Sequence, residues 1–301
     1  MLFSSFVALG LASVAFATPS KRFDGLTVEL SGPPDTVHSV SNLKFKAVVK
    51  NGGSEDVKIF KYSTILDDRL PTKSFSVTKD GKTVPFRGVK LQVNLDVLDD
   101  RAFTLIPAGG SVTVNHDVAS LFDFSSVGAG TFSFQPIADF RLLGAKDEVK
   151  GVESFSKVQV ASNNMVIKVS RDVSKRELPR LEKRADVTCT NTWKRNFIED
   201  SYGVCSNGVI AYTVASTTNI YYCDLFFKEV STITVCSTTT VAARNLRSGT
   251  TLHELTHAVA NTDDISYGCS ANKQLSEAQA VINADNYNCF ASQVYKNTRC
   301  G

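Results

Sequence analysis

The sequence predicts an α+β protein in which a β-sandwich-like first part precedes a mainly helical second part with disulfides. Three observations predict this. Residues 23–170 contain many short stretches of alternating apolar and polar residues, which are typical of half-buried strands. The segments Leu252–Val259 and Leu275–Tyr295 have the apolar spacing of helices. All seven Cys residues lie after residue 188.

Length and charge support two parts with different chemistry. The chain has 301 residues, of which 43% are hydrophobic, so it can form one or two domains with a real core. A net charge of +3 is too small to indicate a nucleic-acid partner. Residues 185–301 carry 8 basic and 10 acidic side chains, whereas residues 1–184 carry 25 and 20.

The N-terminus has the pattern of a secretory signal peptide. Residues 1–20 contain no charged side chain, Leu2 to Phe16 is mostly apolar, and Ala15-Phe16-Ala17 matches an A-x-A cleavage pattern. We therefore predict a signal peptide at residues 1–17 and a secreted, extracellular protein. No other stretch is long and apolar enough to cross a bilayer, so we expect no membrane association after signal removal.

The following region predicts an antiparallel sandwich. The clearest alternating stretches are Leu26–Leu30, Leu43–Ala47 and Phe75–Thr78, and turn signals occur at Asn51-Gly52-Gly53, Asp80-Gly81 and Ala108-Gly109-Gly110. Regularly spaced short strands of this kind are typical of sandwiches. His38 and His116 are isolated from other metal-binding or nucleophilic residues, so we expect both to be structural or solvated.

A charged linker separates the two parts. Residues 171–184 contain six basic and three acidic side chains and little apolar material, which predicts an exposed linker. It ends in Lys183-Arg184, a pair after which a kexin-type secretory protease would cut; Lys175-Arg176 is a second candidate. Cutting after Arg184 would leave residues 185–301 as the mature protein.

The second part contains the motif His253-Glu254-Leu255-Thr256-His257. On a helix, residues i and i+4 lie on one face, so both imidazoles can bind one Zn²⁺ while the Glu takes a proton from water. Thr250 or Thr251 would cap this helix. Two of the four His residues in the chain fall within this motif, which makes a coincidence improbable.

A catalytic zinc site needs a third protein ligand. No His follows the motif, and the nearby donors are Asp263 and Asp264. Either carboxylate could reach the metal through the short polar turn after His257. Tyr267 lies close behind and could donate a hydrogen bond to a developing oxyanion.

These residues give the chain a specific resemblance. His253–His257 followed by Thr262-x-Asp264-x-x-Tyr267-Gly268 resembles the deuterolysin family of fungal zinc endopeptidases, the aspzincins, whose pattern is H-E-x-x-H and then G-T-x-D-x-x-Y-G. The similarity covers the chain from about residue 202 to residue 301. The order of signal peptide, β-rich pro-region and dibasic site is also similar to that family's precursor.

The resemblance implies a zincin-like catalytic domain at residues 185–301 behind a propeptide at residues 18–184. It implies that His253, His257 and Asp264 bind one zinc ion, that Glu254 is the general base, and that Tyr267 stabilises the transition state. This chain has Asn261 where the family pattern has its first Gly, and Asn tolerates a left-handed backbone.

The cysteines show a second departure from the family pattern. The resemblance implies Cys205–Cys223 and Cys236–Cys300, with Cys269–Cys289 as the natural third pair, and leaves Cys189 alone. Family members carry a longer helical segment where this chain passes directly from Cys189 to Cys205. The catalytic domain is therefore expected to be shortened there, and its metal-site helix to expose apolar surface.

Asp285 is a further candidate in the predicted C-terminal helix. Its neighbours are apolar, so it either orients a metal-bound His through the other ring nitrogen or is a solvated helix residue.

The sequence hypothesis is a secreted zinc metalloendopeptidase, made as a preproprotein and activated by cleavage after Arg184. The expected partners are protein or peptide substrates, with basic ones among the candidates, the protein's own propeptide, and the kexin-type processing protease. The alternative is a catalytically impaired, disulfide-stabilised secreted relative that acts as a binding protein. It is motivated by the shortened segment and the unpaired Cys189.

Overall fold

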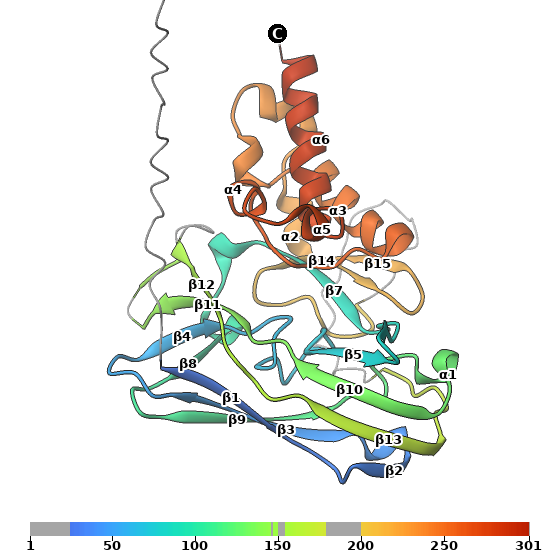
Figure 1. Ribbon diagram of the computed structural model, residues 1–301. Helices are drawn as coiled ribbons and strands as arrows, with labels where there is room; N and C mark the ends of the chain where they lie inside the picture. The colour runs from blue at the N-terminus through green and yellow to red at the C-terminus, as the bar shows by residue number, and fades with distance from the viewer. Residues whose placement is uncertain (1–24, 146, 150–153, 179–199, 301) are drawn as a thin grey trace, which may run out of the picture.

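The computed structural model describes residues 25–145, 147–149, 154–178 and 200–300 (Figure 1). The predicted signal peptide at residues 1–17, the pair Lys183-Arg184 and Cys189 lie outside these ranges. Within them, none of the helices has both the length and the apolar character that a membrane span requires.

Residues 25–178 form a β-rich body. Its strands are β1 (Leu26–Ser31), β2 (Thr36–Ser39), β3 (Lys44–Asn51), β4 (Val57–Phe60), β5 (Phe75–Lys79), β6 (Lys82–Thr83), β7 (Val89–Val93), β8 (Phe103–Ile106), β9 (Ser111–Asp117), β10 (Gly130–Pro136), β11 (Asp139–Gly144), β12 (Ser156–Gln159) and β13 (Met165–Asp172). A short helix, α1 (Phe124–Val127), precedes β10. Single 3-10 turns lie at Val40–Asn42, Leu95–Val97 and Asp100–Ala102.

Two sheets of this body pack face to face. The sheet β1-β3-β9 and the sheet β2-β13-β10-β5-β6 (Figure 1) bury their inward residues in one core, where Phe45 contacts both Phe75 and Phe134. Alternation places apolar side chains on one face of each strand, as in the buried-exposed pattern of β1. A third sheet, β12-β11-β4-β8, extends toward the helices. The predicted sandwich is present, although β2 pairs with β13 in parallel.

Residues 200–300 form the mixed second part. Its elements are β14 (Val209–Val214), β15 (Asn219–Tyr222), α2 (Asp224–Lys228), α3 (Arg247–Ala260), α4 (Cys269–Asn272), α5 (Glu277–Ala280) and α6 (Ala284–Arg299), with 3-10 turns at Thr232–Cys236 and Val241–Ala243. Helices α3 and α6 pack against each other, and α3 lies on β14. The disulfides Cys205–Cys223, Cys236–Cys300 and Cys269–Cys289 confirm the implied pairing.

One sheet joins the two parts. Strand β7 pairs antiparallel with β14, giving the order β15-β14-β7 (Figure 1). Apolar residues of β7 and β14, among them Leu91 and Tyr212, lie in a single buried cluster with Tyr267. The expected α+β composition is therefore confirmed, but the two parts share a sheet and a core.

The first residues of the predicted linker continue the β-rich part. Strand β13 runs to Asp172, and Arg176 is bonded to Asp172 and Ser41, while its carbonyl accepts a hydrogen bond from Arg87. Leu178 packs partly against the core. Arg176 and Leu178 therefore lie against the β-rich part, while residues 179–184 lie outside the described ranges.

Two helix predictions also need correction. Helix α3 begins at Arg247 after Leu246, so Thr250 and Thr251 lie inside it and do not cap it. The predicted single helix at 275–295 is two helices, because the backbone around Asn283 pairs with Asp263 and its side chain accepts hydrogen bonds from the amides of Ile265 and Ser266. These tertiary bonds interrupt the helix. Ser276 caps the first piece in a capping box with Gln279.

Candidate metal centre

Helix α3 presents its polar face to the interior. His253 and His257 are 0% and 3% exposed, and Glu254 between them is 0% exposed. The predicted apolar stripe faces the other way: Leu255 is 42% exposed and Val259 is 81% exposed. The expectation that this helix exposes apolar surface is confirmed. Burial of three ionisable side chains in place of the apolar stripe requires a charged or metal partner.

The loop after α3 supplies that partner. Asn261 ends the helix in the left-handed conformation (φ 53°), as expected for a residue that replaces Gly there. The chain then turns back, and Asp264 places Oδ1 at 3.0 Å from His253 Nε2 and 3.2 Å from His257 Nε2. The two Nε2 atoms are 3.1 Å apart. His253, His257 and Asp264 form a cluster that could hold a metal ion.

The donor atoms fit a tetrahedral zinc ion. Ligands at the usual zinc distances of about 2.0–2.2 Å lie roughly 3.3–3.6 Å apart, close to the separations found here. His257 Nδ1 donates to the carbonyl of Thr262 at 2.8 Å, so its Nε2 lone pair faces the cluster. Asp264 Oδ1 is buried and has no hydrogen-bond partner. The atoms that face the centre are therefore available as ligands.

Charge and burial shift the pKa values of these groups. Burial lowers the pKa of His253 and favours the neutral ring that a metal requires. Burial acts in the same direction on His257, but the charge of Asp264, its hydrogen bond to the ring and the charge of Glu254 together outweigh burial and raise the pKa of His257. Although burial raises the pKa of Asp264, its contacts with both histidines hold that pKa well below its usual range.

Glu254 lies beside the cluster with one free oxygen. The hydroxyl of Thr213 on β14 donates to Glu254 Oε2 at 2.6 Å, whereas Oε1 is buried without a partner. Burial raises the pKa of Glu254 to about 8, and the charge of His257, the Thr213 hydroxyl and the amide of Gln92 act against that increase. A carboxylate with a raised pKa and a free oxygen is suited to accept a proton.

Tyr267 is buried against His253. Its ring is stacked on the imidazole with centroids 6.3 Å apart, and the guanidiniums of Arg141 and Arg244 lie 5.2 and 5.4 Å from the ring centroid. The phenol donates to the carbonyl of Leu91 at 2.5 Å. Burial raises its pKa well above the usual value, so it is a hydrogen-bond donor at neutral pH.

The structure separates the two aspartates that the sequence left as alternatives. Asp264 joins the histidines, whereas Asp263 is bound by Lys73 at 2.8 Å and by Lys90 at 3.3 Å. Both lysines come from the β-rich part. Asp263 therefore takes part in the contact between the two parts of the chain, outside the histidine cluster.

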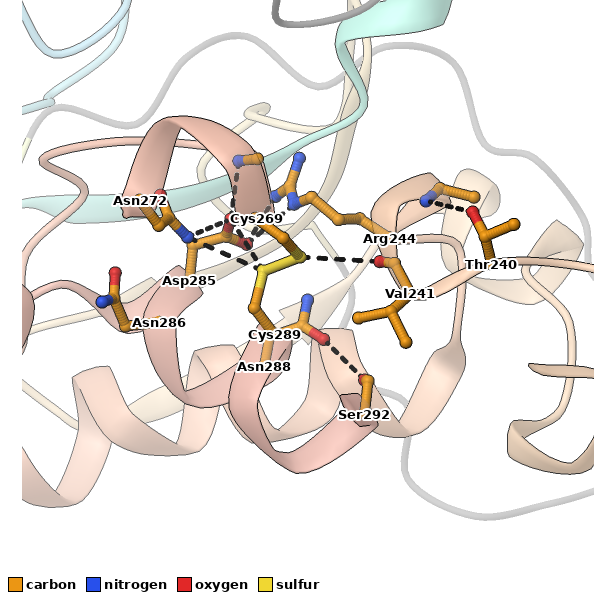
Figure 2. The surroundings of a disulfide bond; sticks show 12 residues. Thr240, Val241, Arg244, Cys269, Asn272, Asp285, Asn286, Asn288, Cys289 and Ser292 are labelled. Carbon is orange, nitrogen blue, oxygen red and sulfur yellow. Dashed lines mark hydrogen bonds and ion pairs between the residues drawn. A yellow bond between two sulfur atoms is a disulfide. The ribbon is translucent and has the colours of Figure 1, made fainter. Parts of the chain in front are cut away.

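Asp285 is fully buried at the start of α6, so the solvated alternative is wrong (Figure 2). Its Oδ1 pairs with the guanidinium of Arg244, and its Oδ2 accepts from the amide of Gly268 and from Asn272. The distance from Oδ1 to His253 Nδ1 is 3.8 Å, longer than a hydrogen bond. Asp285 therefore holds the backbone directly after Tyr267. It lies beside the disulfide Cys269–Cys289 (Figure 2).

Sequence reasoning missed the contributions of Thr213, Arg244 and strand β7. Thr213 lies in a strand without any motif, and Arg244 follows a 3-10 turn 41 residues before its partner. The alternation Val89-Lys90-Leu91-Gln92-Val93 is a detectable strand signal, but it does not reveal the partner strand. Pairing over such a distance is decided by the tertiary structure.

Comparison with known proteins matches the chain to metallopeptidase families. A model of the "Deuterolysin metalloprotease (M35) family" matches residues 1–196, and a model described as "Lysine-specific metallo-endopeptidase" matches residues 154–292. The chain is 28% identical to a neutral protease 2 homolog of Emericella nidulans, covering 95% of this chain and 97% of the relative. That alignment spans 360 positions, more than the length of this chain, so the relative contains residues that this chain lacks.

Two further relatives carry enzyme names. The chain is 27% identical to penicillolysin of Penicillium citrinum, covering 96% of this chain and 98% of the relative. It is 26% identical to the peptidyl-Lys metalloendopeptidase of Armillaria mellea, covering 89% of this chain and 91% of the relative. The match of the first family model to well over half of the chain shows the family. This chain belongs to the deuterolysin metalloprotease (M35) family.

Proposed function

We propose that this protein is a zinc-dependent endopeptidase that hydrolyses peptide bonds in proteins and peptides. The observation that carries the proposal is the convergence of His253 Nε2, His257 Nε2 and Asp264 Oδ1 within 3.0–3.2 Å of one another, with the free oxygen of Glu254 beside them. Membership of a metalloprotease family supports it. His253, His257 and Asp264 would hold one zinc ion.

A bound zinc ion would supply the Lewis acidity that polarises a carbonyl and makes water a nucleophile near neutral pH. Glu254 takes a proton from the attacking water at Oε1 while Thr213 holds Oε2. The water oxygen bonds to the scissile carbonyl carbon, the C–N bond breaks, and Glu254 passes the proton to the leaving amine. Tyr267 donates its phenol hydrogen to the oxygen that gains negative charge.

We further propose that the protein is secreted as a preproprotein. Residues 1–17 would be the signal peptide, residues 18–184 the propeptide, and residues 185–301 the catalytic domain released when a kexin-type protease cuts after Arg184. Three disulfides support an oxidising compartment. Arg176 is tied to Asp172 and Ser41, which favours Lys183-Arg184 over Lys175-Arg176 as the cleavage site.

Glu254→Gln tests the proposed chemistry. The processed protein, after digestion of any β-rich piece that stays bound to it, should contain one zinc per chain, cleave casein, and lose cleavage when a chelator is added. Glu254→Gln should keep the zinc and lower the rate about 10²- to 10⁴-fold. The matched control is Glu277→Gln on the exposed helix α5, which should behave as wild type. A Glu254→Gln protein with wild-type turnover would contradict the mechanism.

The same assay distinguishes the proposed endopeptidase from the alternative, a catalytically impaired binding protein. A folded, processed protein that binds zinc and does not cleave any protein substrate, even after its β-rich piece is digested, would favour a catalytically impaired binding protein. A protein without zinc would favour it further, because the centre would then have no chemical role.

A further inference from the structure

Strand β7 occupies the place beside β14 where an extended peptide would add to the sheet. It pairs antiparallel with β14 from Val89↔Val214 to Val93↔Val209. Without β7, β14 would be an edge strand with open backbone groups next to α3. Open strand edges of this kind bind extended peptides by strand addition. In the intact chain this edge is filled from within (Figure 1).

The backbone of Leu91 is held by two residues of the proposed active site. In a strand, the N–H and C=O of one residue point to the same side, and those of the next residue point to the opposite side. The N–H and C=O of Leu91 point away from β14. Its N–H donates to Asp264 Oδ2 at 2.9 Å, and its C=O accepts from the Tyr267 phenol. The phenol that would act on a substrate carbonyl is therefore already bonded to a carbonyl of this chain.

Side chains of the β-rich part strengthen this contact. Lys90 is 4% exposed and donates to the carbonyl of Thr262, to Asn261 and to Asp263, which also binds Lys73. Arg141 donates to the carbonyl of Ile265. These bonds all reach the loop that carries Asp264 and Tyr267.

A shared core lies behind these polar contacts. Val89, Leu91 and Val93 of β7 are buried in one cluster with Val209, Tyr212 and Val214 of β14. Hydrophobic interfaces that resemble the core of a single domain are typical of obligate, stable complexes. Every contact described here joins residues 60–178 to residues 200–300, so none depends on the peptide bond after Arg184.

We propose that β7 is an inhibitory strand that stays in the active site after the chain is cut after Arg184. The inference rests on the proposed function, because it names the regulation of that site. The cut protein is then a latent complex of two pieces. Activity requires a second event that removes residues 89–93, such as digestion of the β-rich piece or its displacement by a competing extended peptide.

Co-elution after a single cut tests the proposal. The full secreted chain is cut after Arg184 with a kexin-type protease and run on a size-exclusion column. The two pieces should elute together, and casein cleavage should stay within about twofold of the uncut chain. Elution as two separate species, or a rise in cleavage of about tenfold or more on cutting alone, would overturn the proposal.

Variants of the Lys90–Asp263 pair sharpen the test. Lys90→Met, and independently Asp263→Asn, should release part of the β-rich piece after the cut and raise casein cleavage about tenfold or more. The control is Lys58→Met, which removes a lysine whose partner, Asp100, lies within the β-rich part. The role of this pair would be overturned if the Lys90→Met and Asp263→Asn proteins both fold, stay fully associated after the cut and remain as inactive as wild type.

The elution profile also separates this inference from the proposed function. If casein is not cleaved by any form of the zinc-loaded protein, cut, variant or with the β-rich piece digested, the proposed function fails. Co-elution of the cut pieces would then still support the retained strand, and separation would still overturn it.

Discussion

The guanidinium of Arg244 and the carboxylate of Asp285 form a buried ion pair beneath the proposed active site. The Nε and Nη2 atoms of Arg244 lie 2.9 and 2.7 Å from Asp285 Oδ1, and the two side chains are 9% and 0% exposed. The other oxygen of Asp285 accepts from the amide of Gly268 at 2.7 Å. The pair therefore ties the turn after Tyr267 to the first turn of α6.

Asp285→Asn should destabilise the protein strongly. It would leave the Arg244 charge buried without its partner, which typically costs about 3–5 kcal/mol. The free energy of unfolding from urea titration measures this. Asp224→Asn is the matched control, because Asp224 also lies in the first turn of a helix but is exposed. An Asp285→Asn protein within about 0.5 kcal/mol of wild type would show that Arg244 does not need this carboxylate.

Thr213→Val should lower activity without loss of zinc. The substitution removes the donor to Glu254 Oε2, and hydrogen bonds to charged groups contribute about 1.5–3 kcal/mol, which corresponds to roughly 10- to 100-fold in kcat/KM. The measurement is kcat/KM on a peptide substrate together with zinc content, using the form of the protein that cleaves casein. Thr213→Ser keeps the hydroxyl and should restore most of the activity; equal losses in both variants would contradict a role of the hydrogen bond.

Asp67 should make the free energy of unfolding decrease as pH rises. It is buried in the β-rich part, and burial raises its pKa to about 6 from 3.8. The folded state holds the proton of Asp67 more tightly than the unfolded chain does. The contribution of protonated Asp67 to the free energy of unfolding is therefore fully present below about pH 4 and is lost as pH rises through about 6. The loss corresponds to about 3 kcal/mol.

Asp67→Asn should remove that pH dependence. The amide oxygen can still accept from the backbone amides of Arg69 and Leu70. The difference between the unfolding free energies of wild type and Asp67→Asn, measured from pH 4 to pH 7, isolates this group from Glu229, whose pKa burial raises to about 7. A difference that stays constant over this range would refute the assignment.

The exposed apolar residues on α3 and α6 should tolerate polar substitution. Val259 is 81% exposed and Phe290 is 72% exposed, so Val259→Gln and Phe290→Gln should each change the free energy of unfolding by less than about 0.5 kcal/mol. Both should reduce concentration-dependent association, measured by light scattering. Val235→Gln, at a residue 2% exposed, should destabilise strongly by comparison. A large loss of stability at Val259 or Phe290 would mean that these side chains are packed.

The sequence by itself determined the local features of this protein. Alternation predicted strands such as β1, β3 and β5, because successive side chains of a strand face opposite sides. Spacing placed His253 and His257 on one face of a helix, because residues i and i+4 of a helix are neighbours. The resemblance to a known family added Asp264 and the disulfides.

Tertiary structure decided the rest. Which face of α3 is buried depended on the partners brought to it, so the polar face turned inward and Val259 outward. The break between α5 and α6 depended on bonds from Asn283 to a distant loop. Strand β7 filled the edge of β14, more than 100 residues away. Local spacing carries no information about such pairings, because they are set by the free energy of burying and pairing groups from distant parts of the chain.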